Sequence, residues 1–85
     1  MMDATMRERV WERWLTEYPE DANLDERGRD MLLDTYRAEA MAFRFACEDF
    51  PWPLRKMATA LADDLDARFD ALRREGLRAA LRHTR

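Results

Sequence analysis

A Pro-Trp-Pro segment at residues 51–53 separates two long stretches in which apolar residues recur with the spacing of a helix. Proline lacks a backbone N–H and fixes its own φ angle, so it breaks a helix when it lies inside one. Pro53 suits the first turn of a new helix, where its missing N–H would be unpaired anyway. Because the break is short, the helices on either side of it are expected to form an antiparallel hairpin.

The composition is that of a helical protein. Ala, Leu, Arg, Glu, Asp and Met dominate the 85 residues, whereas Val occurs once and Ile is absent. Straight-chain side chains favour helices, and β-branched side chains favour strands. We therefore expect an all-α fold in a single domain over residues 1–85. A chain this short buries only about 60–65% of the surface that its unfolded form exposes, so it is marginally stable alone.

The apolar periodicity predicts three helices. The first begins at a capping box formed by Thr5 and Glu8, the second follows an N-cap at Asn23, and the third starts near Pro53. The expected ranges are about 5–18, 24–49 and 53–80. The sequence thus predicts an antiparallel three-helix bundle with a short first helix and a long hairpin made by the other two. The core-facing stripe expected for the third helix consists of Leu54, Met57, Ala58, Leu61, Leu65, Phe69, Leu72 and Gly76.

The lengths of the three predicted helices do not match. At about 1.5 Å per residue, the first helix is roughly 21 Å long and the other two are roughly 40 Å long. The first helix enters the bundle through the turn at residues 19–23, so it is expected to cover the end of the hairpin distal to Trp52. The end near Trp52 is then left with apolar surface, which a second copy, another protein or tighter packing of the hairpin would cover.

Trp52 has two interpretations. In the first, it caps the hairpin by folding back onto Phe50 and Met57. In the second, it is an ordered aromatic anchor for a partner, because a tryptophan on a rigid turn loses little entropy on binding and is enriched among interface hot spots. The residues alone leave both interpretations open.

Two further apolar pairs lie away from the predicted core faces. Met41 and Phe45 lie at the edge of the polar face of the second helix, and Leu77 and Leu81 lie on the outward side of the third. Exposed apolar groups of this kind favour association with another protein. Together with Trp52, these four residues are the predicted partner-binding set.

Glu39 and Arg68 are charged residues that fall on the predicted apolar faces of the second and third helices. In the expected hairpin, residue 39 lies opposite about residue 64, one helical turn from Arg68. A buried lone charge is costly, so the sequence predicts a buried ion pair between the two that fixes the register of the hairpin. The alternative is a polar contact at an interface.

The charge is unevenly distributed. Residues 1–72 carry 10 basic and 17 acidic side chains and a net charge of −7, whereas residues 73–85 carry five arginines and one glutamate and a net charge of +4. Arginines at a helix C-terminus complement the helix macrodipole. They also bind phosphates, which makes nucleic acid an alternative partner, although the acidic body would repel a duplex. The arginines concerned are Arg73, Arg74, Arg78, Arg82 and Arg85.

The residues that catalysis and metal binding require are scarce. There is one histidine and one cysteine, and no Gly-rich phosphate loop, zinc-ligand spacing or Ser/His/Asp set. Asp63, Asp66 and Asp70 share a helix face, which without further ligands is more typical of a solvated face than of a cation site. We therefore expect a protein that is not an enzyme and that uses no cofactor, metal ion or small-molecule substrate.

The single cysteine, Cys47, lies in an apolar stretch and suits a small core residue in a reducing compartment. No N-terminal apolar run resembles a signal peptide, and no stretch approaches the roughly 20 apolar residues of a membrane span. A cytoplasmic location away from the membrane is therefore expected.

No helix-turn-helix, ribbon-helix-helix, haem, di-iron or J-domain pattern is present. A small helical build without catalytic groups is common among phage and mobile-element proteins, including inhibitors of host defence. The sequence favours a non-enzymatic protein–protein interaction module, either a homodimer or bound to a larger assembly that it regulates or inhibits by occlusion. The alternatives are a nucleic-acid-binding accessory protein that uses the Arg-rich C-terminal helix, and a small structural subunit of a larger particle.

Overall fold

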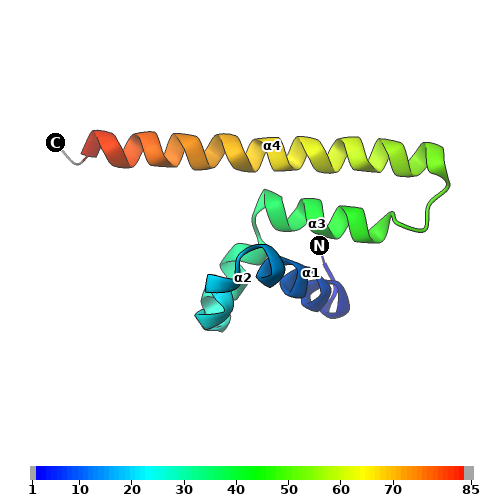
Figure 1. Cartoon of the computed structure of the whole chain (residues 1–85), viewed down its shortest axis with the longest axis horizontal. Helices are drawn as coiled ribbons and strands as arrows, with labels where there is room; N and C mark the ends of the chain where they lie inside the picture. Colours follow the sequence, from blue (N-terminus) through cyan, green and yellow to red (C-terminus); the bar gives the residue numbers. More distant parts are fainter. Residues whose placement is uncertain (1, 84–85) are drawn as a thin grey trace.

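The computed structural model describes residues 2–83, and within them the chain is all-helical. The predicted all-α class is confirmed, but the described residues form four α-helices and one short 3-10 helix instead of the expected three helices. The helix α4 runs along one side of the molecule, α3 packs antiparallel against it, and α1 and α2 lie on the far side of α3 (Figure 1). The elements are α1 (Ala4–Glu17), η1 (Pro19–Asn23), α2 (Glu26–Leu33), α3 (Tyr36–Ala46) and α4 (Trp52–His83).

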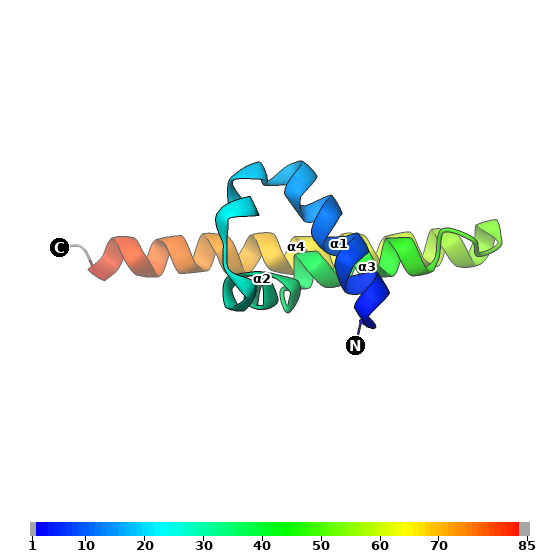
Figure 2. The same ribbon diagram turned by 90° about the horizontal axis from the view of Figure 1, so that it is seen from below.

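The length of the molecule is set by α4. Its 32 residues span about 48 Å at 1.5 Å per residue, close to the longest dimension of a molecule that measures 52 × 27 × 21 Å. The 11 residues of α3 span only about 16 Å, so α3 covers about a third of α4. Figures 1 and 2 both show the C-terminal part of α4 projecting beyond the other helices. Residues 71–82 are accordingly all exposed.

The helix expected over residues 24–49 is broken between α2 and α3. Thr35 causes the break, because its hydroxyl oxygen accepts a hydrogen bond from the backbone N–H of Ala38 at 3.3 Å and its hydroxyl donates to the carbonyl of Leu32 at 2.7 Å. Side chains that bond to nearby backbone in this way compete with a continuous helix. The apolar spacing continues across the break, which is why periodicity predicted one helix. The break shortens the helix that pairs with α4.

Aspartates begin the first two helices. The Asp3 carboxylate accepts a hydrogen bond from the backbone N–H of Met6 at 2.8 Å, so α1 begins one residue before the expected cap at Thr5. The Asp25 carboxylate accepts one from the N–H of Gly28 at 2.9 Å, whereas Asn23, the expected cap, ends η1. Aspartate ranks above threonine as an N-cap, which explains the first difference.

The N-cap at Thr35 carries a testable prediction. Thr35→Ala removes the hydroxyl that starts α3 and is expected to lower the free energy of unfolding by about 1 kcal/mol, measured by urea denaturation. Thr59→Ala is the matched control, because the Thr59 hydroxyl bonds to the carbonyl of Arg55 within an exposed stretch of α4. The control is expected to change stability by less than about 0.5 kcal/mol. Equal effects of the two variants would contradict the capping role of Thr35.

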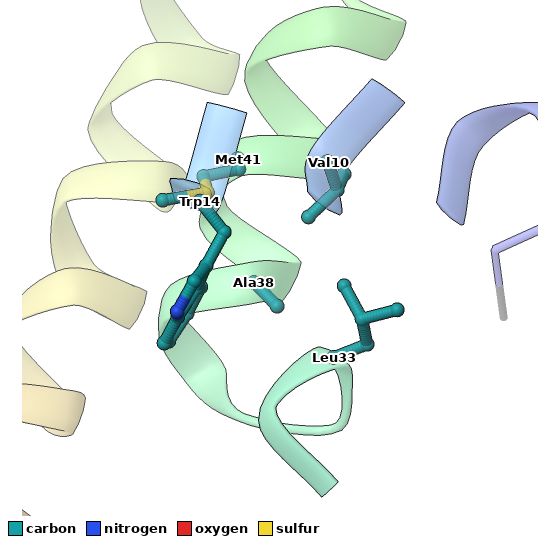
Figure 3. Packing of buried hydrophobic residues seen from close by; sticks show 5 residues of the cluster. All are labelled: Val10, Trp14, Leu33, Ala38 and Met41. Carbon is teal, nitrogen blue, oxygen red and sulfur yellow. The ribbon is translucent and has the colours of Figure 1, made fainter. Parts of the chain in front are cut away.

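The main hydrophobic core lies where α1 and α2 meet α3. Val10 and Trp14 of α1, Leu33 at the end of α2, and Ala38 and Met41 of α3 form one buried cluster (Figure 3). The indole N–H of Trp14 donates to the Asp21 carboxylate at 2.8 Å, and its ring meets the Phe69 ring of α4 edge-on at 6.4 Å between centroids. Trp14 thereby joins η1 and α4 to the same core.

The contact between α3 and α4 is built on small side chains. Ala40 of α3 and Ala58 and Ala62 of α4 are buried. Alanines at a helix contact allow the two axes to approach closely. Cys47 is also buried, at the end of α3. None of the described helices is both long and apolar enough to cross a membrane.

Candidate interaction surface

One side of the α3–α4 pair carries apolar side chains that the rest of the fold leaves open to solvent. We call this surface the hairpin face, and it consists of Phe43 of α3 together with Leu54, Met57, Leu61, Leu65 and Leu72 of α4. Leu61, near its middle, is 54% exposed, and only Leu65 is partly buried. Leu54 and Leu61 are seven residues apart, as are Leu65 and Leu72. Seven-residue spacing places them in a line along α4, as in the seam of a helix pair.

The position of α3 explains why this line is open. α3 packs against the side of α4 that carries Ala58 and Ala62, which lies next to the line of leucines around the helix. The helices α1 and α2 lie on the side of α3 that faces away from α4 (Figure 1). Within the described residues, no helix therefore lies over Leu54, Leu61 and Leu72.

A groove joins the two helices of the hairpin face. It has a volume of about 870 Å³ and lies between the N-terminal part of α1, α3 and the middle of α4. Phe43 and Leu65 both line it, so the apolar side chains of α3 and α4 are directed to the same side of the molecule. Glu39 and Arg7 lie among its polar lining residues. The groove makes the face continuous from α3 to α4.

An ion-pair network holds α3 against α4. The Asp66 carboxylate of α4 accepts hydrogen bonds from Arg37 at 3.0 Å and pairs with Arg44 at 2.8 Å, both from α3. Arg44 also donates to Asp63 at 2.7 Å, and Arg37 pairs with Glu17 of α1. The Asp66 side chain is only 19% exposed, so water screens this network less than a surface ion pair.

The surroundings of Arg37 and Arg44 raise the pKa of both guanidinium groups. Partial burial lowers each pKa, but the hydrogen bonds from Arg37 to Glu17 and from Arg44 to Asp66 and Asp63 outweigh it, together with the nearby negative charges. A raised pKa stabilises the fold at every pH below the unfolded-state pKa, which for arginine lies far above neutral pH. The arginine side of the network is therefore insensitive to pH over the working range.

The predicted buried pair of Glu39 and Arg68 is not formed in the described part of the chain. Glu39 is exposed, and Arg68, whose side chain is 63% exposed, has its nearest carboxylate in Asp64, at 4.0 Å on the same helix. The reason is the rotation of α3, which directs Arg37 and Arg44 toward α4 and turns Glu39 away. This prediction was wrong.

Two of the three aspartates expected to be solvated join α4 to α3 instead, whereas Asp70 is exposed as expected. Asp63 and Asp66 accept from arginines of α3. A signal was available in the sequence, because Arg37 and Arg44 are seven residues apart and Asp63 and Asp66 are three apart. These spacings place the two arginines on one face of their helix and the two aspartates on one face of theirs, so the two charged faces can meet in an antiparallel hairpin.

The predicted partner-binding pair of Met41 and Phe45 is not an exposed patch. Met41 is 6% exposed and belongs to the core, and the Arg9 guanidinium of α1 lies over the Phe45 ring at 4.2 Å from its centroid. Arg9 also pairs with Glu48 at 2.7 Å. α1 thus covers α3 up to its C-terminal end, which the expected arrangement did not foresee, and this prediction is corrected.

Trp52 is the first residue of α4 and is 65% exposed. The Arg55 guanidinium lies over its ring at 5.5 Å from the centroid, and Phe50 and Met57, its expected packing partners, are exposed as well. Trp52 lies about 160° around the helix from Leu54, so it is not part of the hairpin face. Its role as an anchor for a partner stays a prediction.

The C-terminal segment of α4 presents several surfaces. Leu77 and Leu81 are exposed, and Leu77 lies about 140° around the helix from Leu72, away from the hairpin face. Arg74, Arg78 and Arg82 are exposed and follow one another at four-residue spacing along a third side. The Arg73 guanidinium lies 6.0 Å from the centroid of the Phe69 ring. Arg85 lies outside the described residues.

No family model, curated protein or solved structure matches this chain. The candidate site therefore rests on the chain's own geometry. Its groove is open and lined mainly by apolar side chains, and among residues 2–83 no group of three or more His, Cys, Asp or Glu residues is placed to hold a metal ion. An open, mainly apolar surface of this kind is suited to packing against another protein.

Proposed function

We propose that this chain is a non-enzymatic protein–protein interaction module that binds its partner through the hairpin face. The observation that supports the proposal is the line of exposed leucines at seven-residue spacing along α4. Fully burying one leucine side chain contributes about 1.5–3 kcal/mol, so the leucines of this line together supply a substantial part of the free energy that association requires.

The partner presents an amphipathic helix. Leucines in a seam accept the side chains of a facing helix as knobs into holes, and the groove beside Phe43 extends the contact to α3. Such a module acts by covering the surface to which it binds. Regulation or inhibition by occlusion is the mode of action that this fold supports best.

The test is affinity capture from cell lysate, read by mass spectrometry. The bait variant Leu61→Glu/Leu72→Glu places two charges on the hairpin face. The control Ala60→Glu/Ala67→Glu places the same two charges at exposed positions of α4 that face away from both α3 and the hairpin face. Wild type and control are expected to retain a stoichiometric partner, either another protein or a co-expressed untagged copy of this chain, that the first variant loses. Retention of the same partner by all three baits, each shown to be folded by circular dichroism, would contradict the proposal.

Nucleic-acid binding is the second candidate function, and one observation favours it. Arg74, Arg78 and Arg82 are exposed and aligned on the part of α4 that projects beyond the other helices (Figure 2). Arginines that contact phosphates release counterions, so the affinity would fall steeply with salt. A captured partner set that disappears on nuclease treatment, and a steep salt dependence removed by replacing these three arginines with glutamine, would favour this candidate over the first.

A further inference from the structure

The charges along one edge of the hairpin face are self-complementary. Asp64 and Arg68 lie on the same edge of the leucine line, one helical turn apart, and both side chains are more than half exposed. The ion pair between them within α4 is long, at 4.0 Å, and an exposed pair of this kind contributes little to the stability of the fold. In a two-fold antiparallel pairing of two α4 helices, Asp64 of each copy lies opposite Arg68 of the other, so the same ion pair forms twice. This match places the two-fold axis at the level of residues 65–67.

The leucines are compatible with this axis but do not select it, because Leu54, Leu61, Leu65 and Leu72 are also symmetric about residue 63; the match of Asp64 with Arg68 selects residues 65–67. With the axis at residues 65–67, Leu61 of one copy lies opposite Leu72 of the other, and Leu65 flanks the axis in both. The helices then overlap from about residue 52 to about residue 80. The C-terminal segment of each α4, which no other helix of its own copy covers, thereby lies along the N-terminal half of α4 in the other copy. Leu54 and Met57 are exposed there.

The net charges favour this antiparallel direction. Residues 73–85 carry +4, and residues 1–72 carry −7. Antiparallel pairing brings Arg82 of one copy to the level of Phe50 in the other, next to the exposed acidic residues Glu48 and Asp49 of the turn. Parallel pairing would place the two basic segments side by side, and like charges facing each other oppose association.

We propose that the occupant of the hairpin face is a second copy of this chain, paired antiparallel along α4 about a two-fold axis at residues 65–67. This inference rests on the proposed function and names its partner. The helices α3 and α4 of the two copies together form a four-helix bundle, and Phe43 of each copy is directed toward the new interface. Most of α1 and α2 lies outside it, on the far side of α3 (Figure 1), and only the N-terminal residues of α1 border it, where they line the groove beside Phe43.

Sedimentation equilibrium tests the pairing. The wild-type chain is expected to shift from 10.2 kDa to twice that mass as its concentration rises from about 1 μM to about 1 mM. Leu61→Glu/Leu72→Glu is expected to remain at the mass of one chain over this range, whereas the control Ala60→Glu/Ala67→Glu dimerises as wild type does. A wild-type chain that keeps the mass of a monomer at every concentration would overturn the inference. A dimer that Leu61→Glu/Leu72→Glu leaves intact would overturn it as well.

A charge exchange tests the register. Arg68→Glu leaves two carboxylates facing each other at both symmetric contacts and is expected to raise the dimer dissociation constant about tenfold. Adding Asp64→Arg exchanges the two charges, restores both contacts and is expected to return the constant to near the wild-type value. Failure of the second substitution to rescue the first would place the contact elsewhere and contradict the register.

Electron–electron distance measurement tests the direction. A spin label on Ala79→Cys, in a chain that also carries Cys47→Ala, is expected to give a distance between the two labels of about 40 Å, because residue 79 lies far from the axis in each copy. Parallel pairing would bring the labels to about 10–15 Å, since paired helix axes are about 8–10 Å apart. A short distance would therefore contradict the antiparallel direction.

The outcomes separate this inference from the proposed function. A monomer at every concentration that still captures another protein through Leu61 and Leu72 would overturn the second copy as the occupant and support the interaction module. A dimer lost in Leu61→Glu/Leu72→Glu and kept in the control supports both. A monomer whose captured proteins are indifferent to these substitutions would contradict both.

Discussion

Trp14→Ala is expected to cost about 3–5 kcal/mol of unfolding free energy. The side chain is 2% exposed, lies in the main core, donates a hydrogen bond to Asp21 and meets the Phe69 ring of α4. Its removal opens a cavity and leaves the Asp21 carboxylate without this donor. For an 85-residue domain, the whole stability is about 4–13 kcal/mol, so the variant loses a large share of it.

The matched control for this prediction is Trp11→Ala. Trp11 lies on the same helix and is only partly buried, with the Arg29 guanidinium 5.9 Å from its ring centroid. This variant is expected to lose less than half as much stability as Trp14→Ala. Urea denaturation followed by circular dichroism measures both, because the signal does not depend on the tryptophan that is removed. Equal losses in the two variants would show that the core is not centred on Trp14.

The second large effect is expected at Asp66. Asp66→Ala removes the carboxylate that pairs with both Arg37 and Arg44 and leaves these two partly buried guanidinium groups without it. The expected loss is about 2 kcal/mol, since hydrogen bonds to charged groups contribute about 1.5–3 kcal/mol and partial exposure reduces that figure. Because the network joins α3 to α4, the loss should weaken the hairpin in particular.

Asp63→Ala serves as the comparison for Asp66→Ala. The Asp63 side chain is exposed and, among residues 2–83, pairs only with Arg44, so its removal is expected to cost less than about 1 kcal/mol. Urea denaturation at low and high salt measures both variants, and added salt should reduce the difference between them only partly. A cost of Asp66→Ala no greater than that of Asp63→Ala would contradict the central place of Asp66 in the network.

The hairpin and the helical class could be predicted because the signals are local. A proline pair that interrupts two helical patterns leaves few alternatives, and α4 begins at Trp52, within one residue of the expected start. The first helix was predicted to within one residue at each end for a similar reason, since Pro19 ends it. Local stereochemistry decides features of this kind before tertiary packing contributes.

The break at Thr35 could not be read from periodicity, and other errors followed from it. A side-chain hydrogen bond to the backbone ends one helix and starts another without changing the apolar pattern. Once α3 is a separate, shorter helix, its rotation is free to direct Arg37 toward Asp66 and to turn Glu39 outward. The predicted ion pair between Glu39 and Arg68 depended on the register and rotation of an unbroken helix.

The exposure of the hairpin face could not be predicted for a different reason. Leu54, Leu61 and Leu72 belong to the stripe that was expected to face the chain's own core, but α3 packs on the adjacent side of α4, over Ala58 and Ala62. Periodicity indicates that a stripe is suited to packing against a helix, but it does not indicate which side of α4 the chain's own helix covers. The sequence predicted uncovered apolar surface near Trp52, but which leucines of the stripe are exposed became visible only in the structure.

Hydrogen–deuterium exchange over α4, measured at low and high protein concentration, tests the central claim most directly. At low concentration, amides of residues 72–82 are expected to exchange much faster than those of residues 58–66, because only the latter lie in the contact with α3. At high concentration, the amides of residues 72–80 should become protected as the second copy covers them. Protection of residues 72–80 that is already complete at low concentration, or that does not change with concentration, would contradict the account of an open hairpin face covered by a second chain.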